Sequence, residues 1–558
     1  MPEGGAGQAK KKTDEVMKMI PGSEAMRALD SYTIDVLGVP SCVLMERAAL
    51  AIAEAVIAEM KNGTDSRLTL ILTGSGNNGG DGFACARILA MKGFPVMIAF
   101  AGNRRKLSRD AALELKICEK LGIPMEAVGE YYDRLPESSE RELLMRNYLE
   151  KQIFLQRPSV IVDALFGIGL SREITGVSEE VIKAVNAYCK EANGQTGEGT
   201  VKMRKTAVIA ADLASGISAD TGAVMGCAVR ADVTLAVQCA KPGHFLYPGC
   251  EYTGKLKEAD IGIAGFEIAG ISLTGEQKVF RMPEISDLEA LLPKRSRSGN
   301  KGTFGKVFII AGSRNMAGAS LLAAKAALRS GAGMVKVLAP EANRLILQTA
   351  LPEALLSVYE NTEEALEEMK SGLDWCDAVV VGPGLGNTPE TEALVHALIK
   401  SALVKPAVFD ADALNVLKGD PSLLSEAAFP VIVTPHIGEM ARLTGKSAGS
   451  IKADPAGCAE SFYHEYGVSC VLKDARTVIA SAKGLFLNPS GNDGMATAGS
   501  GDVLAGLLGG LLARGTDPDT AGALGAFIHG LAGDAAASRL GKSFLGASDI
   551  IDELKAFC

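Results

Sequence analysis

The chain has 558 residues, which is too long for one hydrophobic core and indicates two to four domains. Its apolar content of 47% and charged content of 22% are ordinary for a globular protein, and its 63 glycines favour an α/β fold with many tight turns. The net charge of −9 argues against a nucleic-acid partner, and the lack of a bilayer-length apolar run argues against a membrane span. The 11 cysteines include no CxxC pair, so they indicate neither a zinc site nor a disulfide framework.

The N-terminal residues predict a polar arm and then a helix. Residues 1–21 include Lys10, Lys11 and Lys12 but no signal-peptide core, so we expect a disordered arm on a cytoplasmic protein. Ser23 is a candidate N-cap for a helix over residues 24–60, whose apolar face is interrupted near Gly38 and Pro40.

A doubly wound parallel sheet of Rossmann-like type is predicted next. Short β-type runs cover residues 68–72, 96–100, 160–162, 207–211 and 233–237, and helical patterns cover residues 82–92, 108–121 and 178–190. Residues 190–205 contain three glycines and predict a surface loop.

The first of these strands runs into a glycine-rich turn over residues 74–82. The turn contains GxGxxG, which is a weak signal by itself. The second strand runs into residues 99–105 without the carboxylate of a dinucleotide fingerprint, so ordinary NAD-dependent hydride transfer is disfavoured. Asn77, Asn78 and Asp81 add polar side chains that a turn alone does not require.

Two later strands end in Asp163 and Asp212. Ligands of open α/β sheets bind outside the carboxyl ends of the strands, where these carboxylates are expected. Oxygens of Asn78, Asp163 and Ser215 could hold a monovalent or hard cation there. The alternative is that each Asp caps the following turn; three converging strand ends favour a site.

This half resembles the NAD(P)H-hydrate epimerase domain. The matching segments are GSGNNGGDG, DALFGIGLSRE and ADLASGI, with EAMRALDSYTID and VLMERA in the first helix; Ala214 stands where the family pattern usually has Pro. The resemblance implies a potassium ion on Asn78, Asp163 and Ser215, and Asp212 as a catalytic residue. It also implies that the hydrated nucleotide binds Asn77, Asn78, Gly79, Gly80, Asp81, Gly167, Ile168, Gly169, Leu170, Ser171, Arg172, Glu173 and Asp212.

Regular patterning weakens over residues 270–302, where Pro283, Pro293 and a basic run at residues 294–297 predict a solvated linker. We therefore expect one domain over residues 22–275 and a second over residues 276–558.

A second α/β domain follows the linker. Strands are predicted over residues 306–311, 334–338, 378–381, 407–409, 431–433, 469–472, 477–480 and 485–487, with an antiparallel edge formed by the last three. Helices are predicted over residues 317–330, 341–350, 389–402, 411–418, 438–444, 502–513 and 519–539. Polar strand ends recur at residues 382–386, 410–415 and 434–439. His436 alone would be a structural histidine, but among these segments it is a candidate substrate contact.

Residues 492–506 are the most informative stretch of the chain. Gly499, Ser500 and Gly501 precede an apolar helical pattern, and the free N–H groups of a helix N-terminus suit a phosphate. Asp502 would repel a phosphate but could accept a hydroxyl proton in phosphoryl transfer. Its alternative role is that of a helix N-cap.

This half resembles the ADP- or ATP-dependent NAD(P)H-hydrate dehydratase, which has a ribokinase-like α/β fold. The matching segments are KGTFGKV, AGSRNMAGA, GPGLG, DADALN, TPHIGEMARL, KDARTVI and NDGMATAGSGDVLAG. The resemblance implies that the hydrated nucleotide faces Gly386, His436, Ile437, Gly438, Glu439, Met440, Ala441, Arg442 and Asp502. It implies that the adenine nucleotide, with Mg²⁺, binds Lys473, Asp474, Ala475, Arg476, Thr477, Asn492, Asp493, Gly494, Met495, Ala496, Thr497, Ala498, Gly499, Ser500 and Gly501.

The two resemblances together predict a repair enzyme that epimerises hydrated NAD(P)H and dehydrates its S form. By analogy to fused architectures we favour ADP over ATP as donor, and we expect a homo-oligomer. Two alternatives remain: a ribokinase-group small-molecule kinase fused to a nucleotide-binding domain, and a nucleotide-binding protein without turnover.

Overall fold

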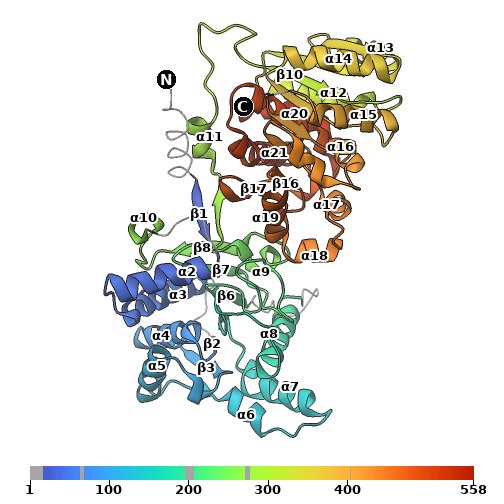
Figure 1. Cartoon of the computed structure of the whole chain (residues 1–558). Helices are drawn as coiled ribbons and strands as arrows, with labels where there is room; N and C mark the ends of the chain where they lie inside the picture. The colour runs from blue at the N-terminus through green and yellow to red at the C-terminus, as the bar shows by residue number, and fades with distance from the viewer. Residues whose placement is uncertain (1–16, 63–67, 195–205, 271–276, 403) are drawn as a thin grey trace. The chain divides into compact units, whose positions relative to one another are not determined.

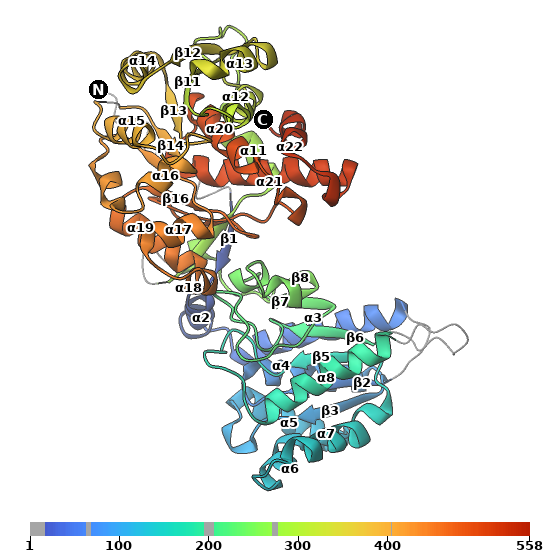
Figure 2. The same cartoon turned by 90° about the vertical axis from the view of Figure 1, so that its right-hand side faces the viewer.

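The computed structural model describes residues 17–62, 68–194, 206–270, 277–402 and 404–558. The chain divides into two compact units, one of Ile20–Val279 and one of Phe280–Cys558 with the N-terminal residues up to Met19. Both units are α/β, as predicted (Figures 1 and 2). Among the described residues, no helix combines the length and hydropathy needed to cross a bilayer.

The unit of Ile20–Val279 contains a seven-stranded sheet in the order β4-β3-β2-β5-β6-β7-β8. Every neighbouring pair in this sheet is parallel. The strands are β2 (Thr69–Thr73), β3 (Val96–Phe100), β4 (Met125–Glu126), β5 (Val160–Ala164), β6 (Ala207–Ala211), β7 (Val233–Val237) and β8 (Lys255–Ala259). β4 and β8 were not predicted; β4 is only two residues long, and β8 alternates too weakly in polarity for a pattern to reveal it.

Helices cover both faces of this sheet, because successive side chains of a strand point to opposite faces. Ile71, Ile98 and Val162 pack with α3 (Ser41–Asn62), α4 (Asn77–Met91) and α5 (Arg109–Lys120). Leu70, Met97 and Ile161 pack on the other face with α6 (Val128–Arg134), α7 (Arg141–Gln152) and α8 (Val177–Gly194). The predicted doubly wound sheet is therefore confirmed. Residues 195–205 of the predicted loop lie outside the described residues.

The predicted first helix is two helices with a break between them. α2 (Ser23–Ser31) continues into a short π-helix, Tyr32–Val36, and α3 starts after Pro40, where the interruption was expected. Ser23 is not the N-cap, because Gly22 occupies that position. The Ser23 hydroxyl instead donates to Asp220 Oδ2 at 2.6 Å. Short helices α9 (Cys250–Thr253) and α10 (Phe266–Ala269) complete this unit.

The second unit is built on an eleven-stranded sheet in the order β1-β9-β18-β17-β16-β15-β14-β13-β10-β11-β12. Its strands are β1 (Lys18–Pro21), β9 (Val279–Met282), β10 (Lys306–Ile310), β11 (Met334–Pro340), β12 (Leu355–Tyr359), β13 (Ala378–Val381), β14 (Ala407–Phe409), β15 (Val431–Val433), β16 (Ser469–Leu472), β17 (Val478–Ser481) and β18 (Gly484–Leu487). β12, β11, β10, β13, β14, β15 and β16 are parallel, and β16, β17 and β18 pair antiparallel, as predicted.

The antiparallel strands are not the edge of the sheet, because β9 pairs with β18 in parallel. The predicted linker therefore contains a strand, and it also contains α11 (Ile285–Leu291). β1 ends the sheet, so the predicted arm does not extend over Lys18–Pro21. Residues 1–16 and 271–276, including the predicted domain boundary, lie outside the described residues. β1, β9 and β12 were not predicted; the segments around β1 and β9, which contain Pro21 and Pro283, were interpreted as an arm and a linker.

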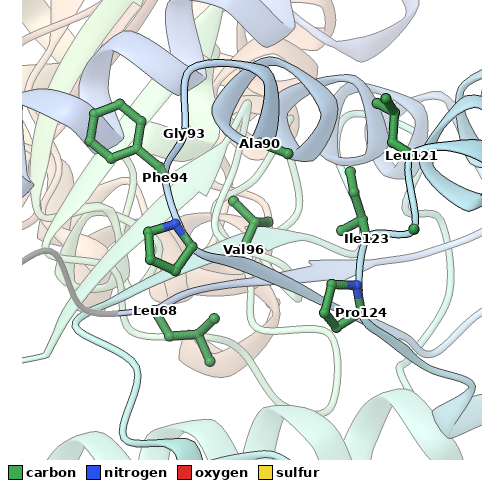
Figure 3. A pocket seen from close by; sticks show the side chains of 10 residues that line it. Leu68, Ala90, Gly93, Phe94, Val96, Leu121, Ile123 and Pro124 are labelled. Carbon is green, nitrogen blue, oxygen red and sulfur yellow. The ribbon is translucent and has the colours of Figure 1, made fainter.

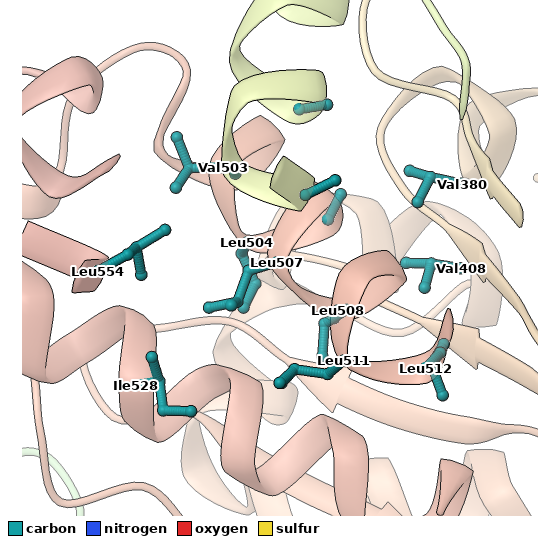
Figure 4. Close-up of a cluster of buried hydrophobic side chains, with 14 of the residues drawn as sticks. Val380, Val408, Val503, Leu504, Leu507, Leu508, Leu511, Leu512, Ile528 and Leu554 are labelled. Carbon is teal, nitrogen blue, oxygen red and sulfur yellow. The ribbon is translucent and has the colours of Figure 1, made fainter. Parts of the chain in front are cut away.

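The helices of this unit are α12 (Ala317–Arg329), α13 (Arg344–Ala350), α14 (Thr362–Trp375), α15 (Pro389–Ile399), α16 (Asp412–Val416), α17 (Ile437–Thr444), α18 (Ala448–Ala453), α19 (Pro455–Tyr466), α20 (Ser500–Ala513), α21 (Pro518–Leu540) and α22 (Ala547–Glu553). α20 lies in the core, where its leucines pack against Val380, Ile528 and Leu554 (Figure 4). A Cβ on Gly506 would lie 2.0 Å from the carbonyl oxygen of Ala323 in α12. Glycine at this position therefore lets α12 approach α20 closely, and this close packing fixes the position of the α20 N-terminus.

Candidate active sites

The first site lies where β2, β5 and β6 end, because these neighbouring strands are parallel. Asp163 in β5 is fully buried; its Oδ1 accepts from the Ser215 hydroxyl at 2.6 Å, and its Oδ2 accepts from the Ser215 N–H at 2.7 Å. Burial raises the pKa of Asp163 to about 6, although these hydrogen bonds oppose the rise. The structure thus brings the predicted pair Asp163 and Ser215 together.

Asn78 lies in the first turn of α4 beside the same strand ends. A Cβ on Gly167 would lie 3.5 Å from Asn78 Oδ1 and 2.9 Å from Asp212 Oδ2, so the three residues converge. Both polar atoms of the Asn78 amide are buried without a hydrogen-bond partner among the described residues. Such groups are costly in a folded protein, so this amide is suited to a ligand or an ion.

Asp212 follows β6 with a φ of 67°, in the left-handed region that non-glycine residues rarely adopt. Its Oδ2 accepts from the N–H of Ile168 at 3.2 Å, and its Oδ1 accepts from the ammonium of Lys241 at 2.5 Å. His244 bonds the Asp212 carbonyl oxygen at 2.8 Å. Sequence reasoning missed Lys241 and His244; a Lys-Pro-Gly-His turn after β7 was the only local signal.

Asp81 lies one helical turn after Asn78 in α4. Burial raises the pKa of its carboxyl group well above the ordinary value, and the nearby charges of Asp212 and Asp30 add to the rise. Two carboxyl groups with different environments therefore face one site, an arrangement typical of acid–base pairs. Ser171, Arg172 and Glu173, in contrast, are exposed on the segment that follows Gly167.

The second site surrounds the N-terminus of α20. Gly499 is the N-cap with a φ of 87°, and Asp502 is the third residue of the helix, so the alternative of an Asp502 N-cap is wrong. Burial raises the pKa of Asp502 to about 6; Asp410 and Asp412 also raise it, and Lys473 opposes them. The carboxylate is thus a stronger base than a solvated Asp.

Lys473 and Asp410 form an ion pair beside Asp502. Lys473 Nζ lies 2.7 Å from Asp410 Oδ1, which also accepts from the Thr434 hydroxyl at 2.6 Å. A Cβ on Gly501 would lie 3.3 Å from Lys473 Nζ, so the ammonium lies at the start of α20. A positive charge and free helix N–H groups together suit a phosphate at this position.

Asp412 and Asn415 form hydrogen bonds to the segments that follow the neighbouring strands β13 and β15. Asp412 Oδ2 accepts from the N–H of Gly386 at 2.7 Å, and Asn415 Oδ1 accepts from Arg442 Nε at 3.1 Å. Ala411, between the two aspartates, has a φ of 50°. Such backbone strain concentrates at functional sites.

His436 is the N-cap of α17. Its Nδ1 accepts from the N–H of Gly438 at 2.9 Å, so in the neutral ring the proton is on the half-exposed Nε2 side. Burial and the charges of Lys473 and Arg442 lower the pKa of His436, which favours the neutral donor. Ile437 and Met440 are buried in the core, so their side chains are not available to a substrate.

The segments predicted to bind the adenine nucleotide, residues 473–477 and 492–501, are partly exposed at this site. Asp474 and Ala475 are exposed. Asn492 donates to Asp534 Oδ1 at 2.8 Å, and Asp493 pairs with Lys542 at 2.5 Å, which fixes the segment before α20. Ser500 Oγ lies 3.4 Å from Nε2 of the buried His529.

A hollow of about 460 Å³ lies at the end of the seven-stranded sheet opposite the first candidate site (Figure 3). Leu68, Pro95 and Pro124 precede β2, β3 and β4, so the hollow adjoins their amino ends. Its lining is Leu68, Ala90, Gly93, Phe94, Pro95, Val96, Leu121, Gly122, Ile123 and Pro124. It offers no acid, base or nucleophile and is not a candidate active site.

The described residues hold no group of three His, Cys, Asp or Glu side chains suited to a metal.

Two family profiles match the chain. A profile described as YjeF-related protein N-terminus matches residues 41–243, and one described as NAD(P)H-hydrate dehydratase matches residues 307–555. The chain is 36% identical to a bifunctional NAD(P)H-hydrate repair enzyme of Moorella thermoacetica, over 96% of each chain. It is 32% identical to the protein of the same name from Escherichia coli, over 97% of this chain and 96% of the relative.

Solved structures match the C-terminal half. An ADP/ATP-dependent NAD(P)H-hydrate dehydratase from Bacillus subtilis, co-crystallised with ATP/Mg²⁺, is 29% identical with a TM-score of 0.43, over 49% of this chain and 96% of that one. A ribokinase-like superfamily protein from Enterococcus faecalis is 28% identical with a TM-score of 0.45, over 50% of this chain and 95% of that one.

Proposed function

The chain belongs to the bifunctional NAD(P)H-hydrate repair enzymes, and we propose that Asp502 and Asp212 are the bases of its two reactions. The enzyme epimerises hydrated NAD(P)H and dehydrates the S form to NAD(P)H at the expense of a nucleotide. For the domains we propose residues 22–275 for epimerisation and residues 276–558, with the ribokinase-like fold, for dehydration. A cytoplasmic location and a homo-oligomeric state stay predictions.

The position of Asp502 carries the dehydratase proposal. Its carboxylate lies in the first turn of α20, beside the Lys473–Asp410 ion pair. A phosphoryl group bound by the α20 N-terminus and Lys473 would lie next to this base.

The dehydration then proceeds in two steps. Asp502 accepts the proton of the C6 hydroxyl while that oxygen attacks the terminal phosphorus of the donor, whose leaving nucleotide departs. The C6–O bond next breaks with loss of phosphate, and a proton leaves C5, which restores the ring double bond. Phosphorylation is required because hydroxide is a poor leaving group. A well-placed base contributes about 10²–10⁴ in rate.

We propose ADP as the donor, bound by residues 473–477 and 492–501, with Mg²⁺ on its phosphates. Mg²⁺ usually binds through one or two carboxylates together with substrate phosphates, so the carboxylates beside the start of α20, Asp410, Asp412 and Asp502, would suit an ion that arrives with the nucleotide. Gly386, His436, Gly438, Glu439, Ala441 and Arg442 are proposed to face the hydrated nicotinamide.

In the epimerase site, inversion at C6 requires one bond at that carbon to open and re-form. Asp212 is proposed to accept the hydroxyl proton as the C6–N1 bond breaks, which forms a carbonyl at C6 and leaves the electron pair on N1. It returns the proton to that oxygen when N1 adds to the other face of the carbonyl. The unpartnered amide of Asn78 supports its role as a K⁺ ligand with Asp163 and Ser215, whose oxygens keep free lone pairs. A bound K⁺ would supply positive charge that orders the substrate oxygens.

The test is incubation of hydrated NADH with ADP, ATP or neither, followed by the dihydronicotinamide absorbance. We expect absorbance to return with ADP, and to return from both epimers in the full chain. A phosphorylated product that accumulates without absorbance would favour the small-molecule kinase. Binding of both nucleotides without turnover would favour the binding protein.

A further inference from the structure

Lys241 is among the largest fully buried side chains of the protein, with 1% of its surface exposed. Its ammonium donates to Asp212 Oδ1 at 2.5 Å and to the carbonyl oxygen of Val237 at 2.7 Å. Lysine is almost never fully buried unless it is paired, and burying its charge is costly. A purely structural role would be filled at lower cost by an apolar side chain of similar volume.

The carboxylate of Asp212 has two different oxygens. Oδ1 accepts from Lys241 and from the Val237 N–H at 3.2 Å, so it is fully engaged. Oδ2 accepts one bond, from the Ile168 N–H, and it lies beside Gly167, where Asn78 also converges. Lys241 therefore holds the oxygen that faces away from the site, and the other oxygen remains open to a substrate proton.

The backbone of Asp212 is also restrained from the same segment. The Leu213 N–H donates to the Ala211 carbonyl oxygen across Asp212 at 2.9 Å, which with the φ of 67° is the pattern of a strained γ-turn. His244 Nδ1 accepts from the Lys241 N–H, so its Nε2 carries the proton and donates to the Asp212 carbonyl oxygen. Strain of this kind persists only where surrounding contacts determine it.

We propose that Lys241 is a positioning residue of the epimerase: it holds Oδ1 of the Asp212 carboxylate and so turns Oδ2 toward the C6 hydroxyl. This inference rests on the proposed role of Asp212 as the base. Lys241 itself does not touch the substrate, so it acts on kcat more than on binding.

The charged and titratable groups around the carboxylate are Asp81 from α4, Lys241 and His244 from the segment after β7, and Glu258 from β8 beyond His244. Asp81 and Glu258 carry acidic groups, and burial lowers the pKa of His244 to about 4, which leaves it neutral. Within this set, Lys241 is therefore the cation that pairs with the Asp212 carboxylate.

The experiment compares full-length Lys241→Met, Lys241→Arg and Asp212→Asn with the unaltered chain. One epimer of hydrated NADH is supplied without nucleotide over a range of concentrations, and its conversion is followed chromatographically. For Lys241→Met we expect a loss of kcat of about 10²-fold with KM changed little. Lys241→Arg, which keeps a charged donor at this position, should recover part of kcat.

Lys255→Met, on the exposed start of β8, is the matched removal of a lysine and should leave kcat unchanged. Thermal unfolding of each variant reports whether the unit of Ile20–Val279 is folded. A Lys241→Met variant with the kcat of the unaltered chain would overturn the inference. If that variant does not fold, a folded Lys241→Arg variant that loses kcat as fully as Asp212→Asn would overturn it. Activity in Asp212→Asn would instead refute the proposed base.

Discussion

Lys473 Nζ and Asp410 Oδ1 lie 2.7 Å apart, although 63 residues separate them in the chain. Asp410 follows β14 and Lys473 follows β16, two parallel strands on either side of β15. Burial lowers the pKa of Lys473, but Asp410 and Glu439 outweigh it and raise the pKa, so the side chain stays an ammonium. The sheet thus holds a permanent positive charge at the N-terminus of α20.

Replacement of Lys473 by Met should therefore weaken dehydration about 10²-fold and raise KM for ADP. The ammonium would no longer balance phosphate charge, and Asp410 would be left buried and unpaired. Steady-state kinetics with varied ADP measures both constants, and Lys473→Arg should recover part of the loss. Unchanged KM and kcat in Lys473→Met would contradict a phosphate contact. Epimerisation serves as the control, because its site lies in the other unit.

Dehydration should lose rate as the pH falls through about 6, the raised pKa of Asp502. The base must be ionised to accept a proton, so protonation at low pH removes it. The measurement is kcat/KM against pH, in which the acidic limb reports this group in the free enzyme. Asp502→Asn should lose about 10²–10⁴-fold in kcat and lose that limb.

The same substitution should stabilise the fold at neutral pH. The pKa of Asp502 is raised in the folded state, so its contribution to stability is fully present below the unfolded pKa and is lost as pH rises through about 6. Asp502→Asn removes that loss, which amounts to up to about 3 kcal/mol. Denaturant unfolding at pH 5 and at pH 8 should reveal a larger gain for the variant at pH 8. Equal gains would refute the assignment of the titrating group.

The sequence was sufficient to find the strand ends that carry Asp163 and Asp212 and the helix start that carries Asp502. Their signals are local, since each lies between an apolar run and a glycine-rich turn. The partners Lys241 and Asp410 could not be inferred, because the contacts join different strands of a sheet whose order the sequence does not state. For the same reason β9 was taken for a linker, because the strand with which it pairs, β18, lies far along the chain.

Substitution of Asn78 by Ala should reduce epimerisation and its response to K⁺. The amide is buried and has no hydrogen-bond partner among the described residues, so its loss costs the fold little. Epimerisation should be assayed in K⁺ and in a large organic cation at equal ionic strength. We expect K⁺ to accelerate the unaltered enzyme at least about tenfold more than Asn78→Ala. An equal response of both proteins would remove Asn78 from the cation site.

The close contact of α12 with α20 should make the second unit intolerant of Gly510→Ala. A Cβ at this position would lie 1.7 Å from Ser330 Oγ and 2.9 Å from the carbonyl oxygen of Ala327, so α12 and α20 would have to move apart. Overpacking of this kind costs about 1–3 kcal/mol, and the displaced N-terminus of α20 should also lower dehydration. The matched control is Gly318→Ala in α12, where a Cβ meets nothing within 4 Å and the substitution should stabilise by about 0.5–1 kcal/mol. Thermal unfolding of both variants distinguishes the expected loss of stability from the expected gain, and epimerisation serves as the internal reference for activity. A Gly510→Ala variant as stable as the unaltered chain would refute the role of this contact.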